Sequence, residues 1–242
     1  MSTDLTRVLP RVVVPPVDAP EDAYAAALFR RQRRYLRAVL RRAFPYRRPV
    51  QHDVACADGR AVRLLNGLVR EAHGYDRSPA RLAVASRAGL FASWHLVTEA
   101  VPVPATDDGP AVVTAFGLLP EGRGEDPERA VAFAARVLPH HGAGLLVVEN
   151  TGNSRALGHL RRPSRGGGWA PECAHEQVAA LLRWYGFEIV ELAGFGVLPP
   201  ARYRGRLGVA ASRVDDTLSG AAPLGRYARE VVYIARRVTG AP

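Results

Sequence analysis

The chain has 242 residues, of which 48% are hydrophobic and 23% are charged. This length and balance are typical of one globular α/β domain with additions, large enough to bury a sizeable core. The formal net charge is +10, and all 33 basic residues are arginine. The absence of lysine excludes a lysine Schiff base and a Walker-type phosphate-binding lysine.

The excess of arginine accompanies a composition dominated by Ala, Arg, Gly, Val and Pro, which is typical of a GC-rich coding bias. The charge alone therefore does not indicate nucleic-acid binding, which we disfavour. Cys56 and Cys173 provide neither a disulfide framework nor a metal site. We also find no apolar run long enough for a membrane span and no signal-peptide pattern. A cytoplasmic protein without a bound metal is the resulting expectation.

The first predicted elements are an extended Pro- and Val-rich arm over residues 1–20 and a helix over Glu21–Phe44. One face of this helix is apolar, formed by Tyr24, Ala27, Leu28, Tyr35, Leu36, Val39 and Leu40. Most other positions are arginine. We interpret them as a solvated flank that covers the sheet or the mouth of the site; a partner- or phosphate-binding face is the alternative.

From residue 50 onward, predicted strands and helices alternate. The predicted strands are Val50–Ala55, His73–Asp76, Trp94–Thr98, Ala111–Phe116, Ala143–Glu149, Glu188–Leu192 and Val231–Arg236. The predicted helices between them are Gly59–Arg70, Pro79–Ala88, Asp126–Leu138 and Glu172–Tyr185, with Ser78 as an N-cap. Apolar strands separated by helices predict a doubly wound, mostly parallel seven-stranded sheet with helices on both faces.

We expect two regions along the chain. Residues 1–48 would form the arm and the basic helix, and residues 49–242 a single domain. Two insertions, at about 150–172 and 194–228, interrupt the alternation and would cap the site.

The segment His52–Arg60 is typical of a strand end, a tight turn of small residues and a helix start, and Asp76 lies at the tip of the next strand. A doubly wound domain offers its crevice to an adenosine-containing ligand in this way. Small residues let the backbone approach the ligand, and a carboxylate can accept hydrogen bonds from two ribose hydroxyls. Ala55 and Ala57 occupy positions where glycine is expected, and alanine disfavours a positive φ.

In order and spacing, these segments resemble the class I S-adenosylmethionine-dependent methyltransferases over about residues 48 to 237. Asp53–Arg60 is similar to the family's Asp-x-Gly-x-Gly-x-Gly-Arg loop, and Gly74–Pro79 to the acidic tip of its second strand. Further similar segments are Leu96–Ala100, Val112–Phe116, Arg136–Pro139 with Gly142 and Gly144, and the Gly-Phe of Gly186–Val190. The resemblance implies a Rossmann-like methyltransferase fold with S-adenosylmethionine as cofactor.

The same resemblance implies a set of cofactor-binding residues: Asp53, Ala55, Cys56, Ala57, Gly59, Asp76, Arg77, Glu99, Ala100 and Phe116. Asp76 would bind the ribose hydroxyls, and Glu99 would lie near adenine. Trp94 or Phe116 would contact the adenine ring, and Asp53 or backbone carbonyls would face the sulfonium.

Methyl transfer is an in-line displacement, so the protein mainly aligns the acceptor and excludes water. A general base is needed only for a hydroxyl or a protonated amine. The candidate acceptor-site residues are Asn150 and Asn153 after the fifth strand, His159 and His175 around the Arg- and Gly-rich segment 161–168, and Tyr203. Turn formation, capping or a surface position is the alternative for each. Arg202, Arg204 and Arg206 beside Tyr203 would suit an anionic acceptor.

The sequence therefore predicts methyl transfer to a small-molecule acceptor, such as a sugar, a lipid-linked compound or another specialised metabolite. One alternative is an RNA methyltransferase, disfavoured because the chain lacks an Asn/Asp-Pro-Pro-Tyr motif and paired catalytic cysteines. Another is a protein of this fold that binds the cofactor without transferring methyl, which the two alanines favour. A homodimer stays open.

Overall fold

The structure is a computed structural model that describes residues 23–98, 109–119, 127–138, 143–150, 175–198, 210, 213–215, 217 and 225–238. Its strands are β1 (Val50–Val54), β2 (Glu71–Asp76), β3 (Ser93–Leu96), β4 (Ala111–Leu119), β5 (Gly144–Asn150), β6 (Phe187–Phe195) and β7 (Glu230–Arg237). Its helices are α1 (Ala23–Ala43), α2 (Arg60–Leu65), α3 (Pro79–Arg87), α4 (Pro127–Val137) and α5 (His175–Trp184).

The strands form one seven-stranded sheet in the order β3-β2-β1-β4-β5-β7-β6. Strand β1 pairs in parallel with β2 and β4, and the β2–β3 and β4–β5 pairs are also parallel. Only β7 runs against its neighbours, β5 and β6. The predicted doubly wound, mostly parallel sheet is confirmed. Because the strand order reverses between β1 and β4, their carboxyl ends border the crevice where such sheets bind ligands.

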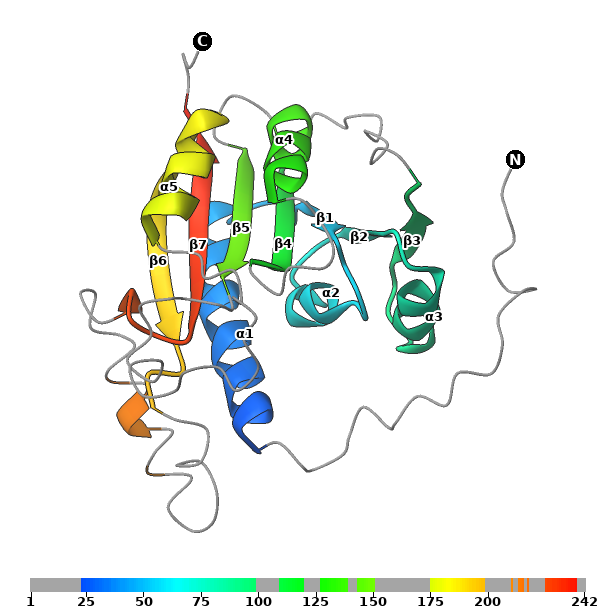
Figure 1. Cartoon of the computed structure of the whole chain (residues 1–242). Coiled ribbons are helices and arrows are strands. Elements are labelled where there is room, and N and C mark those ends of the chain that lie inside the picture. Colours follow the sequence, from blue (N-terminus) through cyan, green and yellow to red (C-terminus); the bar gives the residue numbers. More distant parts are fainter. Residues whose placement is uncertain are drawn as a thin grey trace, which may run out of the picture.

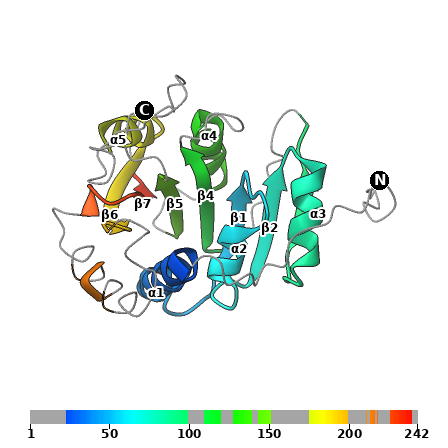
Figure 2. The same cartoon turned by 60° about the horizontal axis from the view of Figure 1, so that its bottom comes forward.

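Helices cover both faces of the sheet, with α4 and α5 on one face and α1 and α2 on the other (Figures 1 and 2). Consecutive strand residues supply the two cores in alternation: Val113 packs with Phe133 of α4, whereas Val112 packs with Leu36 of α1 and Leu64 of α2. Both valines are fully buried. This explains why the central strands are apolar throughout rather than alternating.

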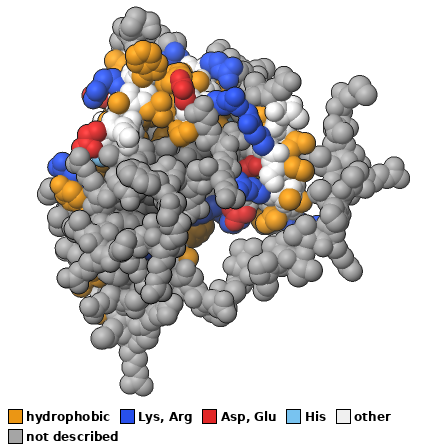
Figure 3. All heavy atoms as spheres, in the orientation of Figure 1, with side chains coloured by type: hydrophobic (Ala, Val, Ile, Leu, Met, Phe, Trp, Pro, Cys, Tyr) orange, Lys and Arg blue, Asp and Glu red, His pale blue; other side chains and the backbone are white. Residues whose placement is uncertain are grey.

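The apolar face predicted for the N-terminal helix is confirmed. Tyr24, Leu28 and Leu36 are at most 8% exposed, as are Ala27, Val39 and Leu40, and Tyr35 meets the Phe195 ring edge-on at 5.8 Å. The arginines on its outer side are mostly exposed, but Arg31 is buried and forms an ion pair with Asp215. Described arginine side chains on the face seen in Figure 3 lie among hydrophobic and acidic ones.

Several element boundaries differ from the prediction. Helix α2 ends at Leu65 instead of Arg70, because Asn66 leaves the helical conformation and Gly67 follows with φ of 78°. Strand β6 continues to Phe195, so the first two residues of the predicted 194–228 insertion belong to the sheet. The N-cap of α3 is confirmed, since the Ser78 hydroxyl accepts from the Arg81 amide at 3.3 Å. None of the helices in the described ranges has the length and apolar character needed to cross a membrane.

Three histidines from adjacent strands form a stacked row: His52 of β1, His73 of β2 and His95 of β3. Ring centroids are 5.3 Å apart for His52 and His73, and 5.5 Å for His73 and His95. The His52 ring meets Phe133 of α4 edge-on, and its Nδ1 lies 3.2 Å from the Tyr75 hydroxyl. Burial, together with the two neighbouring histidines, lowers the pKa of His52 to about 4.

We expect His52→Phe to remove part of the loss of stability that acid causes. The folded-state pKa of His52 lies below its ordinary value of 6.5, so the unfolded chain binds more protons between the two values. The contribution of neutral His52 to the free energy of unfolding is fully present above pH 6.5 and is lost as the pH drops toward 4. Lowering the pH from about 7.5 to about 5 should destabilise the native protein by about 1–2 kcal/mol more than the variant.

Urea unfolding of both proteins at the two pH values measures this difference. The readout is the acid-induced loss of unfolding free energy in the native protein minus that in the variant. Burial raises the pKa values of Asp53 and Glu230 to about 7, so these two groups stabilise both proteins as the pH falls, and their contribution cancels in this difference. An equal response of native protein and variant would contradict the role given to His52.

Candidate functional site

The 55–59 loop joins β1 to α2 at the carboxyl edge of the sheet. Its backbone is left-handed at three alternate residues, with φ of 55° at Ala55, 48° at Ala57 and 79° at Gly59. Each alanine in this conformation costs about 1–2 kcal/mol relative to the right-handed one. The positions where the sequence analysis expected glycine thus do adopt conformations that favour glycine, and the chain accommodates alanine there under strain.

Backbone hydrogen bonds and one carboxylate hold this loop. The Cys56 amide donates to the Tyr75 carbonyl at 3.0 Å, and the Gly59 amide to the Cys56 carbonyl at 2.7 Å. Asp76 Oδ2 accepts from the Ala57 amide at 2.8 Å, and its Oδ1 from the Ser78 amide at 2.7 Å. Asp76 is only 4% exposed. Its carboxylate therefore ties the loop to β2, a role the sequence analysis did not foresee.

These two contacts leave acceptor capacity on Asp76, because each carboxylate oxygen carries a second lone pair. The side chain can thus hold the loop and accept hydrogen bonds from a ligand's hydroxyl groups together. Arg77, which follows it, is exposed.

Trp94 of β3 packs directly against two glycines of the site. A Cβ atom added to Gly74 would lie 2.5 Å from the Trp94 ring, and one added to Gly59 2.7 Å from it. Cys56 lies beside them, is 4% exposed, and has a thiol pKa that burial and the nearby carboxylates raise. These glycines are needed for close packing, and the Cys56 thiol is neutral at physiological pH.

Asp53 lies at the next-to-last position of β1, on the face that α2 covers. It is 1% exposed and accepts a hydrogen bond from the Thr114 hydroxyl at 2.7 Å, and Gln51 in turn donates to Thr114 at 3.0 Å. Its other oxygen, Oδ2, has no hydrogen-bond partner among the described residues. Burial raises the pKa of Asp53 to about 7, against the Thr114 hydrogen bond that lowers it. Asp53 can therefore exchange a proton near neutral pH.

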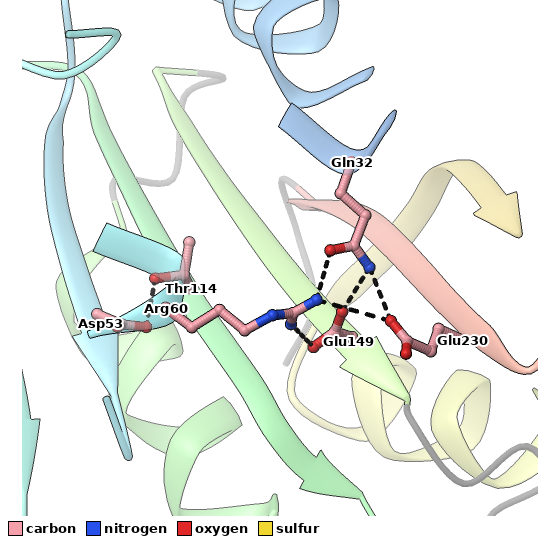
Figure 4. Close-up of polar contacts among 6 residues, drawn as sticks. All are labelled: Gln32, Asp53, Arg60, Thr114, Glu149 and Glu230. Carbon is pink, nitrogen blue, oxygen red and sulfur yellow. Dashed lines mark hydrogen bonds and ion pairs between the residues drawn. The ribbon is translucent and has the colours of Figure 1, made fainter. Parts of the chain in front are cut away.

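A second polar cluster, which we call the Arg60 network, joins four elements (Figure 4). Arg60 Nη1 donates to Glu149 Oε2 and Nη2 to Gln32 Oε1, both at 2.6 Å. Gln32 Nε2 donates to Glu149 Oε1 at 2.7 Å and to Glu230 Oε2 at 3.0 Å. The network thus connects α1, α2, β5 and β7 at the carboxyl edge of β5.

The charges of the Arg60 network are interdependent. Burial would lower the pKa of Arg60, but Glu149 and Glu230 outweigh it and raise the value, so the guanidinium stays charged. Burial and Glu149 raise the pKa of Glu230 to about 7. The Arg60 guanidinium also lies 5.8 Å from the Phe116 ring centre, within cation–π range.

Gln32, Arg60, Glu149 and Glu230 were not among the site residues predicted from the sequence. Two signals were available. Glu149 ends a strand that is otherwise apolar, and Gln32 is the one amide in an arginine-rich helix. Neither signal indicates which residues Gln32 and Glu149 contact, because the four residues of the network are up to 198 positions apart in the chain.

The structure brings Asp53, the 55–59 loop and Asp76 together, but spreads the other predicted residues. Phe116 is 9% exposed and packs in the core beneath α1. Asn150 ends β5 and is fully buried. His175 begins α5, on the opposite face of the sheet from α1, and stacks on Tyr233 with ring centroids 5.6 Å apart. Glu99, Ala100, Asn153, His159 and Tyr203 lie outside the described residues.

No protein-family model matches the sequence, and no curated protein matches it. Solved structures do match the fold. The (4+2)-cyclase SpnF is 21% identical with a TM-score of 0.51, over 85% of this chain and 81% of that one. The magnesium protoporphyrin IX methyltransferase of Synechocystis PCC 6803, solved with S-adenosylhomocysteine, is 13% identical with a TM-score of 0.55, over 89% and 85%. The plantazolicin methyltransferase BamL, also solved with S-adenosylhomocysteine, is 13% identical with a TM-score of 0.55, over 87% and 85%.

At these low identities the comparisons establish the fold. The chain has the Rossmann-like fold of the class I S-adenosylmethionine-dependent methyltransferases, as the resemblance of its motifs implied.

We expect Ala55→Gly and Ala57→Gly each to stabilise the protein by about 0.5 kcal/mol. Glycine removes roughly 1–2 kcal/mol of left-handed strain, partly offset by the greater entropy that it gives the unfolded chain. Ala38→Gly is the control, since Ala38 is an exposed position inside α1. That substitution should destabilise by about 1 kcal/mol. Urea unfolding measures all three, and a loss at Ala55 or Ala57 as large as at Ala38 would contradict the strain.

Proposed function

We propose that the protein is a methyltransferase that uses S-adenosylmethionine to methylate a small molecule. The observation that carries the proposal is the 55–59 loop held by Asp76 at the carboxyl edge of β1 and β2, in a sheet with the methyltransferase strand order. Two matching structures contain S-adenosylhomocysteine, the product of this cofactor.

The residues present fit such a cofactor. The loop carries only small side chains at 55, 56 and 57, so a ligand can approach its backbone closely, and Asp76 offers lone pairs for two ribose hydroxyls. Asp53 has an unpaired oxygen in the described structure that a ligand's donor group would satisfy. Assignment of Arg77, Glu99, Ala100 and Phe116 to the cofactor stays a prediction.

When bound, the cofactor supplies an electrophilic methyl group. The chain's part is to hold the acceptor in line and to exclude water. Asn150, buried at the end of β5, stays a candidate for acceptor contacts, as do Asn153, His159, His175 and Tyr203. Where the acceptor is a hydroxyl or a protonated amine, one of these polar residues would receive the proton.

The names of matching proteins support a small-molecule acceptor. The plantazolicin methyltransferase and the magnesium protoporphyrin IX methyltransferase are named for small molecules. We carry this class over to the present chain and propose a specialised metabolite, including sugars and lipid-linked compounds. The anionic character of the acceptor, the homodimer and the cytoplasmic compartment stay predictions.

A second candidate is a protein of this fold that binds the cofactor without transferring methyl. One matching structure is named as a cyclase rather than a methyltransferase. Ala55 and Ala57 add support, because their methyl groups occupy two positions of close approach in the loop where glycine was expected.

We expect the protein to bind S-adenosylhomocysteine, and Asp76→Asn to weaken binding by about 10- to 100-fold. The variant loses the charge and one of two carboxylate acceptors, and a hydrogen bond to a charged group contributes roughly 1.5–3 kcal/mol. Calorimetric titration measures the affinity. Asp58→Asn is the control, because Asp58 belongs to the same loop but is exposed, and its carboxylate pairs with Arg63 in the described structure. A folded native protein that does not bind S-adenosylhomocysteine would overturn the proposal.

Label transfer separates the two candidates. The protein is incubated with methyl-labelled S-adenosylmethionine and an extract of its own cells that contains both small molecules and RNA. Label in a small molecule supports the methyltransferase. Label that stays on the cofactor favours the second candidate, and label in the RNA fraction would contradict both.

A further inference from the structure

Helix α1 contacts Arg60, the residue directly after the 55–59 loop, through the side chain of Gln32. Gln32 of α1 is fully buried, and its amide oxygen accepts from Arg60, the residue that directly follows Gly59. The Gln32 amide nitrogen donates to Glu149 and to Glu230. Three partners thus fix the amide in one orientation, and the amide in turn fixes the Arg60 guanidinium (Figure 4).

The loop needs such support because its conformation is strained. Strained backbone persists only where the surroundings determine it from several sides. Asp76 holds the middle of the loop through the Ala57 amide. At the other end, Arg60 begins α2 and is held to the end of β5 by Glu149 and to α1 by Gln32.

We propose that Gln32 is a positioning residue for the cofactor loop. By holding Arg60 against Glu149, it keeps the strained 55–59 backbone in the conformation that binds S-adenosylmethionine. The proposal rests on the proposed function. It makes α1, which precedes the predicted cofactor-binding domain in the sequence, part of the cofactor site.

The neighbouring residue of α1 provides a matched control. Arg33 also joins α1 to α2, but at the far end of α2: it donates to the Arg63 carbonyl at 2.7 Å and to the Asn66 carbonyl at 2.9 Å. Arg33→Ala therefore weakens the docking of the same two helices without touching the loop. If Gln32 acted only through that docking, the two substitutions would have equal effects.

The test is a double-mutant cycle on the full chain, with calorimetric titration of S-adenosylhomocysteine as the readout. Gln32→Ala and Arg33→Ala are each made in the native loop and in a loop carrying Ala55→Gly and Ala57→Gly. We expect Gln32→Ala to weaken binding about tenfold in the native loop and less than about twofold in the glycine loop. The glycine loop adopts the same backbone conformation with little strain, so it needs less support from Gln32. Arg33→Ala should change the affinity by less than about twofold in both.

Thermal unfolding of each variant shows that it is folded. Gln32→Met, which keeps the length of the side chain, replaces Gln32→Ala if the latter does not fold. Three results would overturn the positioning role. The first is that Gln32→Ala weakens S-adenosylhomocysteine binding equally in the native and the glycine loop. The others are that Arg33→Ala weakens binding as much as Gln32→Ala does, or that Gln32→Ala leaves the affinity unchanged. Failure of the native protein to bind would instead overturn the proposed function, and this inference with it.

Discussion

The carboxylate of Asp76 is the contact on which the site depends. It accepts the Ala57 and Ser78 amides, so one side chain joins the loop after β1 to the start of α3. The bond to the Ala57 amide holds the loop in the conformation in which Ala55 and Ala57 have a positive φ. The same carboxylate keeps lone pairs for a ligand, so loop geometry and ligand binding share one residue.

Several buried ionisable groups of the sheet have pKa values that shift in opposite directions. Burial raises the pKa values of Asp53 and Glu230 to about 7 and lowers that of His52 to about 4. The acids favour the folded state as the pH falls, whereas His52 opposes it. Arg60 keeps a permanent positive charge beside Glu149 and Glu230, which is why two carboxyl groups can be buried together at the carboxyl edge of β5.

The fold could be predicted from the sequence because its signals are local. Apolar strands, the Ser78 cap and the small-residue turn each indicated their element, and their order indicated the sheet. Asp76 was found for the same reason, since it is the last residue of a predicted strand. The Arg60 network could not be found in this way, because Gln32, Glu149 and Glu230 meet only once the sheet has closed. Helix α2 was predicted too long because the apolar Leu68 and Val69 continue its pattern beyond the Asn66-Gly67 turn. Five predicted site residues lie outside the described structure, so their roles stay predictions.

Hydrogen exchange shows whether the loop held by Asp76 binds the cofactor. Backbone amides of residues 55–60 and 76–78 are followed by mass spectrometry with and without saturating S-adenosylhomocysteine. We expect slower exchange in both segments, because the ligand would cover the loop and the tip of β2. Saturating ligand that leaves both segments unchanged, or protects a different part of the sheet edge, would contradict it.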